Sequence, residues 1–132
     1  MALSEAEGLL RIAAVDLESA QASFDPTVFR EGAWGFWLQQ AVEKALKAWL
    51  LHLGSDPPLT HDLRRLVLLL EAKGVATAKL QPLAQLTVYA VQFRYDADPT
   101  PLGLDREDLN RQVKELIARV QALVMPGSET EA

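Results

Sequence analysis

The stretch that decides the fold is FWLQQAVEKALKA, residues 36–48. Its apolar residues recur at three- and four-residue spacing, which is typical of one face of an α-helix. Asp25-Pro26 is a favourable helix start, because aspartate caps a helix and proline at the first helical position loses no needed hydrogen bond. Near Leu53-Gly54, glycine can adopt the left-handed conformation that ends a helix. We therefore predict one long helix over this range, and we expect this aromatic segment at the centre of a helical bundle.

Two glycines lie inside this predicted helix, Gly32 and Gly35. Each costs about 1 kcal/mol of helix stability relative to alanine. We expect that they permit a close contact with a neighbouring helix or a slight bend.

One helix is predicted before the central helix and another directly after it. Ser4 and Glu7 have the spacing of a capping box at the start of the first helix. Thr60 is the predicted cap of the third helix, which ends at Lys73-Gly74. The apolar faces of these two helices consist of Leu10, Ala13, Leu17, Ala20 and Phe24, and of Leu63, Leu66, Val67 and Leu70.

Two further helices are predicted in the last third of the chain. The fourth begins near Leu80, because Pro82 is tolerated only in a first turn. The segment 98–103 interrupts the helical pattern, and Asp105 caps the fifth helix. Their apolar faces consist of Leu83, Leu86, Ala90 and Phe93, and of Leu109, Val113, Leu116, Ile117, Val120 and Leu123.

No stretch alternates with period two for long enough to predict a strand. The fold class is therefore all-α, an up-and-down helical bundle of about five helices, four of them long. A chain of 132 residues favours a single domain. We assign residues 1–125 to the bundle and residues 126–132 to a polar tail.

Composition excludes several classes of function. There are no cysteines, which excludes disulfides, thiol nucleophiles and cysteine-ligated metals. The net charge of −5 argues against coating nucleic acid or an anionic membrane by bulk charge. The N-terminal segment 1–5 lacks the apolar core of a signal peptide, and the apolar run 66–70 is too short to span a bilayer. We expect a cytoplasmic protein with no membrane partner.

Common catalytic motifs are missing. The sequence has no phosphate-binding glycine loop, no His-Glu-x-x-His and no serine-hydrolase elbow. His61-Asp62 could ligate a metal with a third group, but we favour a local role, with Asp62 near the positive end of a helix dipole. We therefore predict no catalytic residue and no metal ligand.

A polar cluster interrupts the apolar central helix. It consists of Gln39, Gln40, Glu43, Lys44 and Lys47. Glu43 and Lys47 have the favourable order for an ion pair, worth about 0.2–0.5 kcal/mol. We favour a solvated face for the cluster, as for Asp16 and Glu18 of the first helix. Gln40 is the exception, because it shares a face with aromatic residues and should hydrogen-bond a specific partner.

A second polar cluster, Arg94-Tyr95-Asp96, lies where the fourth helix ends. Helix-end electrostatics and a capping aspartate explain it without a ligand. Trp34, Trp37 and Trp49 are predicted to be core or interface anchors rather than base-stacking platforms, since such platforms normally accompany a basic groove.

Taken in order, four segments resemble the HEPN domain family (higher eukaryotes and prokaryotes nucleotide-binding). Residues 36–48 resemble its second-helix signature, an aromatic turn leading into Gln-Gln-Ala-x-Glu-Lys-x-Leu-Lys. Residues 58–63 match Thr-His-Asp-Leu at the start of helix three. Residues 89–96 match the Arg-Tyr-Pro-Asp ending of helix four without its proline, and residues 14–20 match the opening Ala-x-x-Asp-Leu-x-x-Ala. The resemblance covers residues 9–124.

The resemblance implies a helical bundle that forms a dimer or larger homo-oligomer. It also implies nucleotide binding and a minimal nucleotidyltransferase as partner, in a toxin–antitoxin-like pair. Several branches of the family cleave RNA with an arginine followed, four to six residues later, by a histidine. No histidine follows Arg94 at that spacing, so we do not expect this reaction and leave RNA open as a partner.

The site residues that the resemblance implies form one candidate set for binding a nucleotide or a partner. The set is Gln40, Glu43, Lys44, Lys47, His61, Asp62, Arg94, Tyr95 and Asp96. Lys44, Lys47 and Arg94 are candidate phosphate contacts, and Tyr95 is a candidate stacking ring. Equally, the matched residues could tie helices two, three and four together.

We predict a protein that binds a nucleotide, its one candidate cofactor, or a nucleotidyltransferase, and that does no chemistry itself. The first alternative is a ribonuclease-like toxin that uses a rearranged set such as His61 with Arg94. The second alternative is a structural protein whose aromatic central helix forms an oligomer interface.

Overall fold

The computed structural model describes residues 3–126, except for the side chain of Arg94. It contains five α-helices and one 3₁₀ helix within that range. They are α1 (Glu5–Ala22), α2 (Glu31–His52), α3 (Leu63–Ala72), η1 (Gln81–Leu86), α4 (Thr87–Tyr95) and α5 (Arg106–Val124). The described residues form no strand, and the predicted all-α bundle is confirmed.

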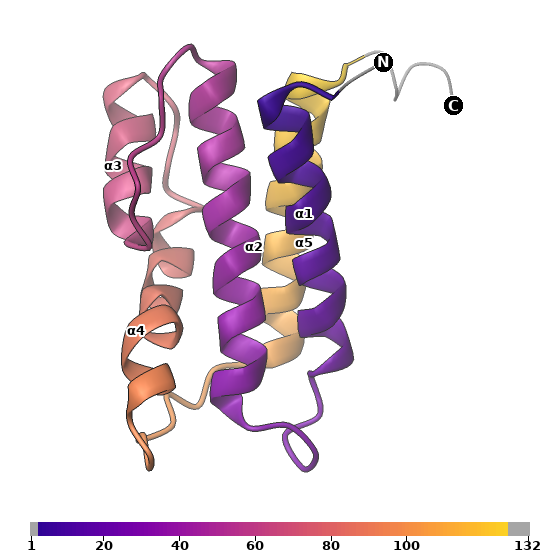
Figure 1. The fold of residues 1–132 in the computed structure, drawn as a ribbon, viewed down its shortest axis with the longest axis vertical. Coiled ribbons are helices and arrows are strands. Elements are labelled where there is room, and N and C mark those ends of the chain that lie inside the picture. Colours follow the sequence, from indigo (N-terminus) through magenta and orange to yellow (C-terminus); the bar gives the residue numbers. More distant parts are fainter. Residues whose placement is uncertain (1–2, 127–132) are drawn as a thin grey trace.

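Helix α2 occupies the centre of the bundle, as predicted. Figure 1 shows α1 and α5 on one side of it and α3 and α4 on the other. It packs against every other helix. Trp34, Leu38 and Leu46 on α2 are fully buried, and Trp49 is nearly so. A helix surrounded by neighbours is apolar on most of its circumference, which explains why its pattern extends beyond one narrow stripe.

The prediction of four long helices is wrong by one. Helices α1, α2 and α5 have 18, 22 and 19 residues, whereas α3 and α4 have 10 and 9. In Figure 1, α3 lies beside one half of α2 and α4 beside the other half. The segment around Pro82 forms the 3₁₀ helix η1 instead of extending α4, since proline cannot donate the hydrogen bond that a longer helix would need there.

Two of the predicted helix caps are confirmed, and a third is wrong. Ser4 Oγ accepts a hydrogen bond from Glu7 N, and Asp105 Oδ1 accepts one from Asp108 N, both as predicted. The cap of α3 is Asp62, which accepts from Arg64 N, so the prediction of Thr60 is wrong by two residues. The Thr60 hydroxyl instead accepts a hydrogen bond from Asp62 N.

The predicted start of α2 at Asp25-Pro26 is also wrong, because α2 begins at Glu31. Asp25 does accept hydrogen bonds from the backbone and the hydroxyl of Thr27, at 2.9 and 2.7 Å. These bonds close a single turn, in which Phe29 N donates to Asp25 O. An aspartate caps an isolated turn as well as a helix, so the motif alone does not set the helix length.

Close helix contact at the two glycines of α2 is confirmed. A Cβ atom added to Gly35 would lie 2.4 Å from the Tyr89 ring, and one added to Gly32 would lie 3.2 Å from Phe93. Tyr89 also packs edge-on against Trp34, with ring centroids 5.9 Å apart. We call Gly32, Trp34, Gly35, Tyr89 and Phe93 the aromatic joint, since they hold α4 against α2.

Glu31 secures the start of α2 to α4 and to the following loop. Its Oε1 accepts hydrogen bonds from the hydroxyl of Tyr89 at 2.7 Å and from Leu102 N at 2.8 Å. Its Oε2 accepts one from Gly103 N at 3.2 Å. Burial and this contact with a carboxylate raise the pKa of Tyr89 above its ordinary value.

No helix within residues 3–126 is both long enough and apolar enough to cross a membrane. The predicted tail lies mostly in residues 127–132, outside the described part of the chain.

Candidate functional site

Most of the candidate residues on α2 belong to one continuous set of hydrogen bonds and ion pairs. We call this set the polar network, and it consists of Asp16, Gln39, Gln40, Glu43, Lys44, Lys47 and His61. It joins α1, the middle of α2 and the residue that precedes the cap of α3. It therefore brings together residues that are up to 45 positions apart in the sequence.

Glu43 is the centre of the polar network and is buried. Its Oε1 accepts a hydrogen bond from Gln39 Nε2 at 3.0 Å and lies 2.9 Å from His61 Nδ1. Its Oε2 accepts one from Lys47 Nζ at 3.0 Å, so the predicted i,i+4 pair is confirmed. Three donors from two segments thus converge on one carboxylate.

The network continues from Gln39 to α1. Gln40 Nε2 donates to Gln39 Oε1 at 2.7 Å, and Lys44 Nζ donates to Gln40 Oε1 at 3.1 Å. Lys44 Nζ also lies 2.6 Å from Asp16 Oδ2 in an ion pair between α2 and α1. The prediction that Gln40 hydrogen-bonds a specific partner is confirmed.

The electrostatics of Glu43 follow from its partners. Burial by itself would raise the pKa of the Glu43 carboxyl. Hydrogen bonds from His61, Lys47 and Gln39 outweigh burial and hold that pKa below its ordinary value. Glu43 is therefore ionised at neutral pH, and its charge is compensated inside the network.

The prediction of a solvated face is wrong for three network residues. Gln39 is fully buried, and Asp16 and Glu43 are also buried. Gln39 is a site residue that the predicted set lacks, and its position four residues before Glu43 is the signal for their contact. Asp16 lies three residues after Ala13 and four before Ala20 on the apolar face of α1, which is the signal that would have placed it inward.

His61 is the most exposed member of the network. Its side chain is 66% exposed, against 7% for the Glu43 side chain that contacts its Nδ1. Because an ionised carboxylate only accepts hydrogen bonds, Nδ1 carries the proton in this contact, and a neutral ring then has its lone pair on Nε2. A buried carboxylate that orients an exposed imidazole in this way can support acid–base chemistry.

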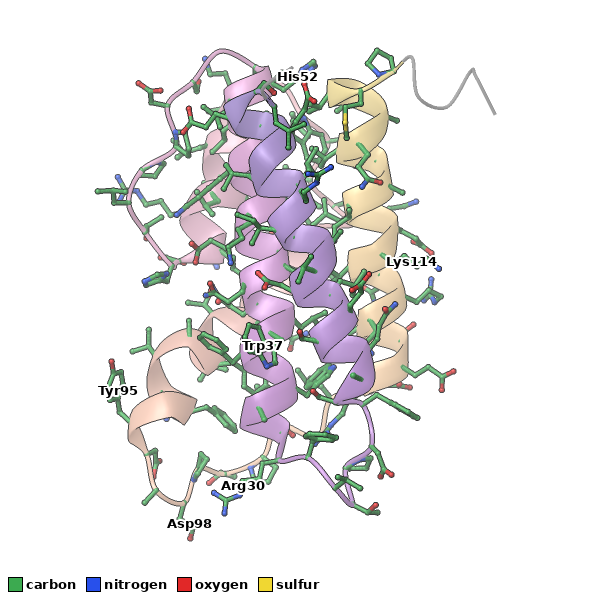
Figure 2. All side chains as sticks on the ribbon, turned by 45° about the vertical axis from the view of Figure 1, so that its right-hand side comes forward. Arg30, Trp37, His52, Tyr95, Asp98 and Lys114 are labelled. Carbon is green, nitrogen blue, oxygen red and sulfur yellow. The ribbon has the colours of Figure 1, made fainter. Side chains whose placement is uncertain are left out.

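The remaining candidate residues are divided between two places. Asp62 caps α3 next to His61, as the local interpretation predicted. Tyr95 and Asp96 lie at the end of α4, where Tyr95 is 82% exposed and Figure 2 shows it pointing outward. Asp96 Oδ1 accepts a hydrogen bond from Asp98 N, the turn-capping role that was expected. The side chain of Arg94 lies outside the described part of the structure.

The end of α4 is remote from Glu43. Phe93, in the last turn of α4, packs against Gly32 in the first turn of α2. Glu43 follows Gly32 by eleven residues, which corresponds to about 16 Å along a helix at 1.5 Å per residue. Within one chain, the structure thus brings Gln40, Glu43, Lys44, Lys47 and His61 together and leaves Tyr95 and Asp96 apart from them. Among the residues described, no group of three or more acidic or histidine side chains could hold a metal ion.

Comparison with known proteins supports the resemblance found in the motifs. The family model described as HEPN domain matches residues 6–128, nearly the whole chain. Comparison with curated proteins gives no match, and comparison with solved structures gives none either. The chain belongs to the HEPN domain family.

Proposed function

We propose that this chain is a binding member of the HEPN family that takes a nucleotide, or a protein that carries one, and does no chemistry of its own. The observation that carries the binding role is the match of the HEPN domain model to residues 6–128. The polar network pairs Lys44 with Asp16 and Lys47 with Glu43 inside the bundle. Residues whose charges are compensated in this way stabilise the fold, and the chain then acts through its surface.

The proposed partners are those that the family resemblance implies. They are a second copy of this chain and a minimal nucleotidyltransferase, in a toxin–antitoxin-like pair in the cytoplasm. Lys44, Lys47 and Arg94 stay candidate phosphate contacts, and Tyr95 stays a candidate stacking ring. At Lys44 and Lys47 a phosphate would have to compete with Asp16 and Glu43.

Nucleotide-dependent stabilisation tests the proposal directly. The melting temperature of the full chain is measured with ATP, GTP, CTP, UTP and the monophosphates. A ligand at 100 times its Kd raises the stability of a folded protein by about 2.7 kcal/mol. We expect at least one nucleotide to raise the melting temperature. No shift with any nucleotide, together with no co-purifying chain in native mass spectrometry, would contradict the proposal.

A second candidate function is a ribonuclease-like activity centred on His61. The observation that favours it is the contact between buried Glu43 and His61 Nδ1, which leaves Nε2 of an exposed ring for proton transfer. RNA cleavage should then disappear in His61→Ala and persist in the matched variant His52→Ala. Cleavage that survives His61→Ala excludes His61 as the catalyst.

A structural role as an oligomer is the third candidate, favoured by an exposed aromatic side chain on α2. Trp37 is 39% exposed and packs edge-on against Phe36, with ring centroids 5.4 Å apart. Buried interfaces are enriched in tryptophan. A sedimentation experiment at micromolar concentration tests this role, since a monomer would contradict it, and Trp37→Ala should weaken any oligomer that forms.

A further inference from the structure

A groove lies between η1 and α5, away from the polar network. Its volume is about 830 Å³, and its walls come from the loop before η1, from η1 itself and from one face of α5. Both η1 and α5 pack against α2. The volume lies within the range of about 300–1,000 Å³ that is typical of sites for small molecules.

The floor of this groove is apolar and firmly packed. Leu80, Leu83 and Leu116 close the bottom of the groove and are at most 4% exposed. The accessible apolar surface comes from Ala76, Ala78 and Pro82, which are exposed. The loop before η1 is held in place by the Thr77 hydroxyl, which donates to Glu71 Oε2 at 3.0 Å. The groove is therefore a formed concavity with an apolar lining.

The rim of the groove carries more cations than the rest of this acidic chain would suggest. Lys79, Arg111 and Arg119 line it together with one carboxylate, Glu115, although the net charge of the chain is −5. Arg111 is neutralised by ion pairs with Asp108 and with Glu115. The rim thus has two cations, Lys79 and Arg119, that no ion pair joins to a carboxylate within residues 3–126.

Arg119 is also fixed in position. Its guanidinium group lies over the ring of Trp49, 4.5 Å from the ring centroid. This cation–π contact orients the side chain without neutralising its charge. Lys79 lines the groove from the loop before η1 and Arg119 lines it from α5, so the two cations belong to different walls.

We propose that this groove binds a nucleoside phosphate, with the base on the apolar floor and the phosphates between Lys79 and Arg119. An inorganic anion alone would leave the apolar floor and most of the volume empty. An apolar molecule alone would leave two cations without a partner. This inference rests on the proposed nucleotide-binding function and assigns the nucleotide to the groove, in place of the candidate contacts on α2 and α4.

Calorimetric titration of the full chain with ATP tests the site by reversing one charge at a time. Lys79→Glu places a carboxylate on the rim and should weaken ATP binding by about tenfold or more, equivalent to about 1.4 kcal/mol. Lys114→Glu is the matched control, because it changes the net charge equally on a part of α5 that does not line the groove. Figure 2 shows Lys114 pointing away from the bundle. Equal weakening in both variants would reveal a bulk-charge effect and overturn the proposal.

A second pair of variants tests the volume without changing charge. Ala78→Trp fills the groove from its wall and should abolish ATP binding, whereas Ala118→Trp, on an exposed position of α5 outside the groove, should not. ATP binding that survives both Ala78→Trp and Lys79→Glu overturns the groove but leaves nucleotide binding intact. A wild-type chain that binds neither ATP nor AMP overturns both proposals.

Inorganic tripolyphosphate separates a nucleoside phosphate from a free polyphosphate. It should bind about tenfold or more weakly than ATP, because it cannot use the apolar floor. Equal affinity would mean that the phosphate chain alone is recognised, which would overturn the role of the floor and with it the proposal.

Discussion

Two joints hold neighbouring helices against α2, and they are built on opposite principles. The polar network joins α2 to α1 and to His61 through charges, with Lys44 at 2.6 Å from Asp16 and Lys47 at 3.0 Å from Glu43. The aromatic joint places α4 against α2 mainly through shape, where the absence of a side chain at Gly35 admits the Tyr89 ring, and one hydrogen bond from Tyr89 to Glu31 adds to it. The polar network is stable only while each donor has its acceptor. The aromatic joint is stable only while no side-chain atom is added at Gly35.

The largest expected effect is the loss of the central acceptor of the polar network. Glu43→Ala leaves Gln39, Lys47 and His61 without their shared carboxylate, two of them in buried or half-buried positions. Breaking a buried ion pair from one side should lower the free energy of unfolding by about 3 kcal/mol. Urea denaturation measures this loss. The matched variant Glu115→Ala, whose side chain is 60% exposed, should change it by less than about 0.5 kcal/mol. A loss below about 1 kcal/mol in Glu43→Ala would show that water replaces the carboxylate.

The aromatic joint should respond to the addition of a single methyl group. In Gly35→Ala the new Cβ would lie 2.4 Å from the Tyr89 ring, so the ring or the helix must move. Overpacking of this kind typically costs about 1–3 kcal/mol. We expect a net loss of about 2 kcal/mol, although alanine favours a helix.

The same substitution at another glycine is the control for this prediction. Gly8 lies on α1, and an added Cβ would meet nothing within 4 Å. Gly8→Ala should therefore raise the free energy of unfolding, by up to about 1 kcal/mol. If both variants change the stability in the same direction, the close contact at Gly35 is not what decides the outcome.

A double-mutant cycle measures the coupling energy of the ion pair between Asp16 on α1 and Lys44 on α2. Asp16→Asn and Lys44→Met, alone and together, should give a coupling energy of about 1 kcal/mol, because both side chains are mostly shielded from water. The exposed pair Arg111 and Glu115 serves as the comparison, and its coupling should be at most about 0.5 kcal/mol. Equal coupling in the two cycles would mean that burial adds nothing to the network.

Lowering the pH should destabilise the folded protein through protonation of Glu43 in the polar network. Its pKa in the folded protein is held below the ordinary value of 4.5, so the unfolded chain takes up a proton first as the pH falls. The stabilisation by Glu43 is therefore complete above that value and is lost progressively below it. Glu43→Gln should flatten the fall of stability as the pH drops below the ordinary value of 4.5. The slope will not vanish, since the pKa values of Asp25 and Asp108 are also lowered by their hydrogen bonds. An unchanged slope would show that other carboxyls dominate.

The smallest effect is expected just beyond the aromatic joint. Tyr95 is 82% exposed at the end of α4, so Tyr95→Phe should change the free energy of unfolding by less than about 0.5 kcal/mol. Tyr89→Phe makes the same chemical change but removes the hydrogen bond to Glu31, and should cost about 1 kcal/mol. Thermal denaturation of both variants measures the difference. A larger cost at Tyr95 would indicate that it packs against another chain.

The two joints differ in how far the sequence predicted them. The Glu43–Lys47 pair of the polar network was predicted because its members are neighbours on one helix. The pair of Lys44 with Asp16 was not, since 28 residues separate them and only the packing of α1 on α2 brings them together. Gly35 indicated a close contact, but nothing in its neighbourhood identified Tyr89 as the residue that fills the space.

The sequence by itself determined the all-α class, some of the helix caps and the family. Caps such as Ser4 and Asp105, and apolar spacing such as that of α5, act within a few residues, so local chemistry is sufficient to decide them. Only the tertiary structure decided which polar residues are buried, because helical spacing gives the face on which Asp16 or Gln39 lies but not the helix that covers it. The groove beside Lys79 and Arg119 likewise depends on the tertiary structure, since its lining residues come from segments about 30 positions apart in the sequence.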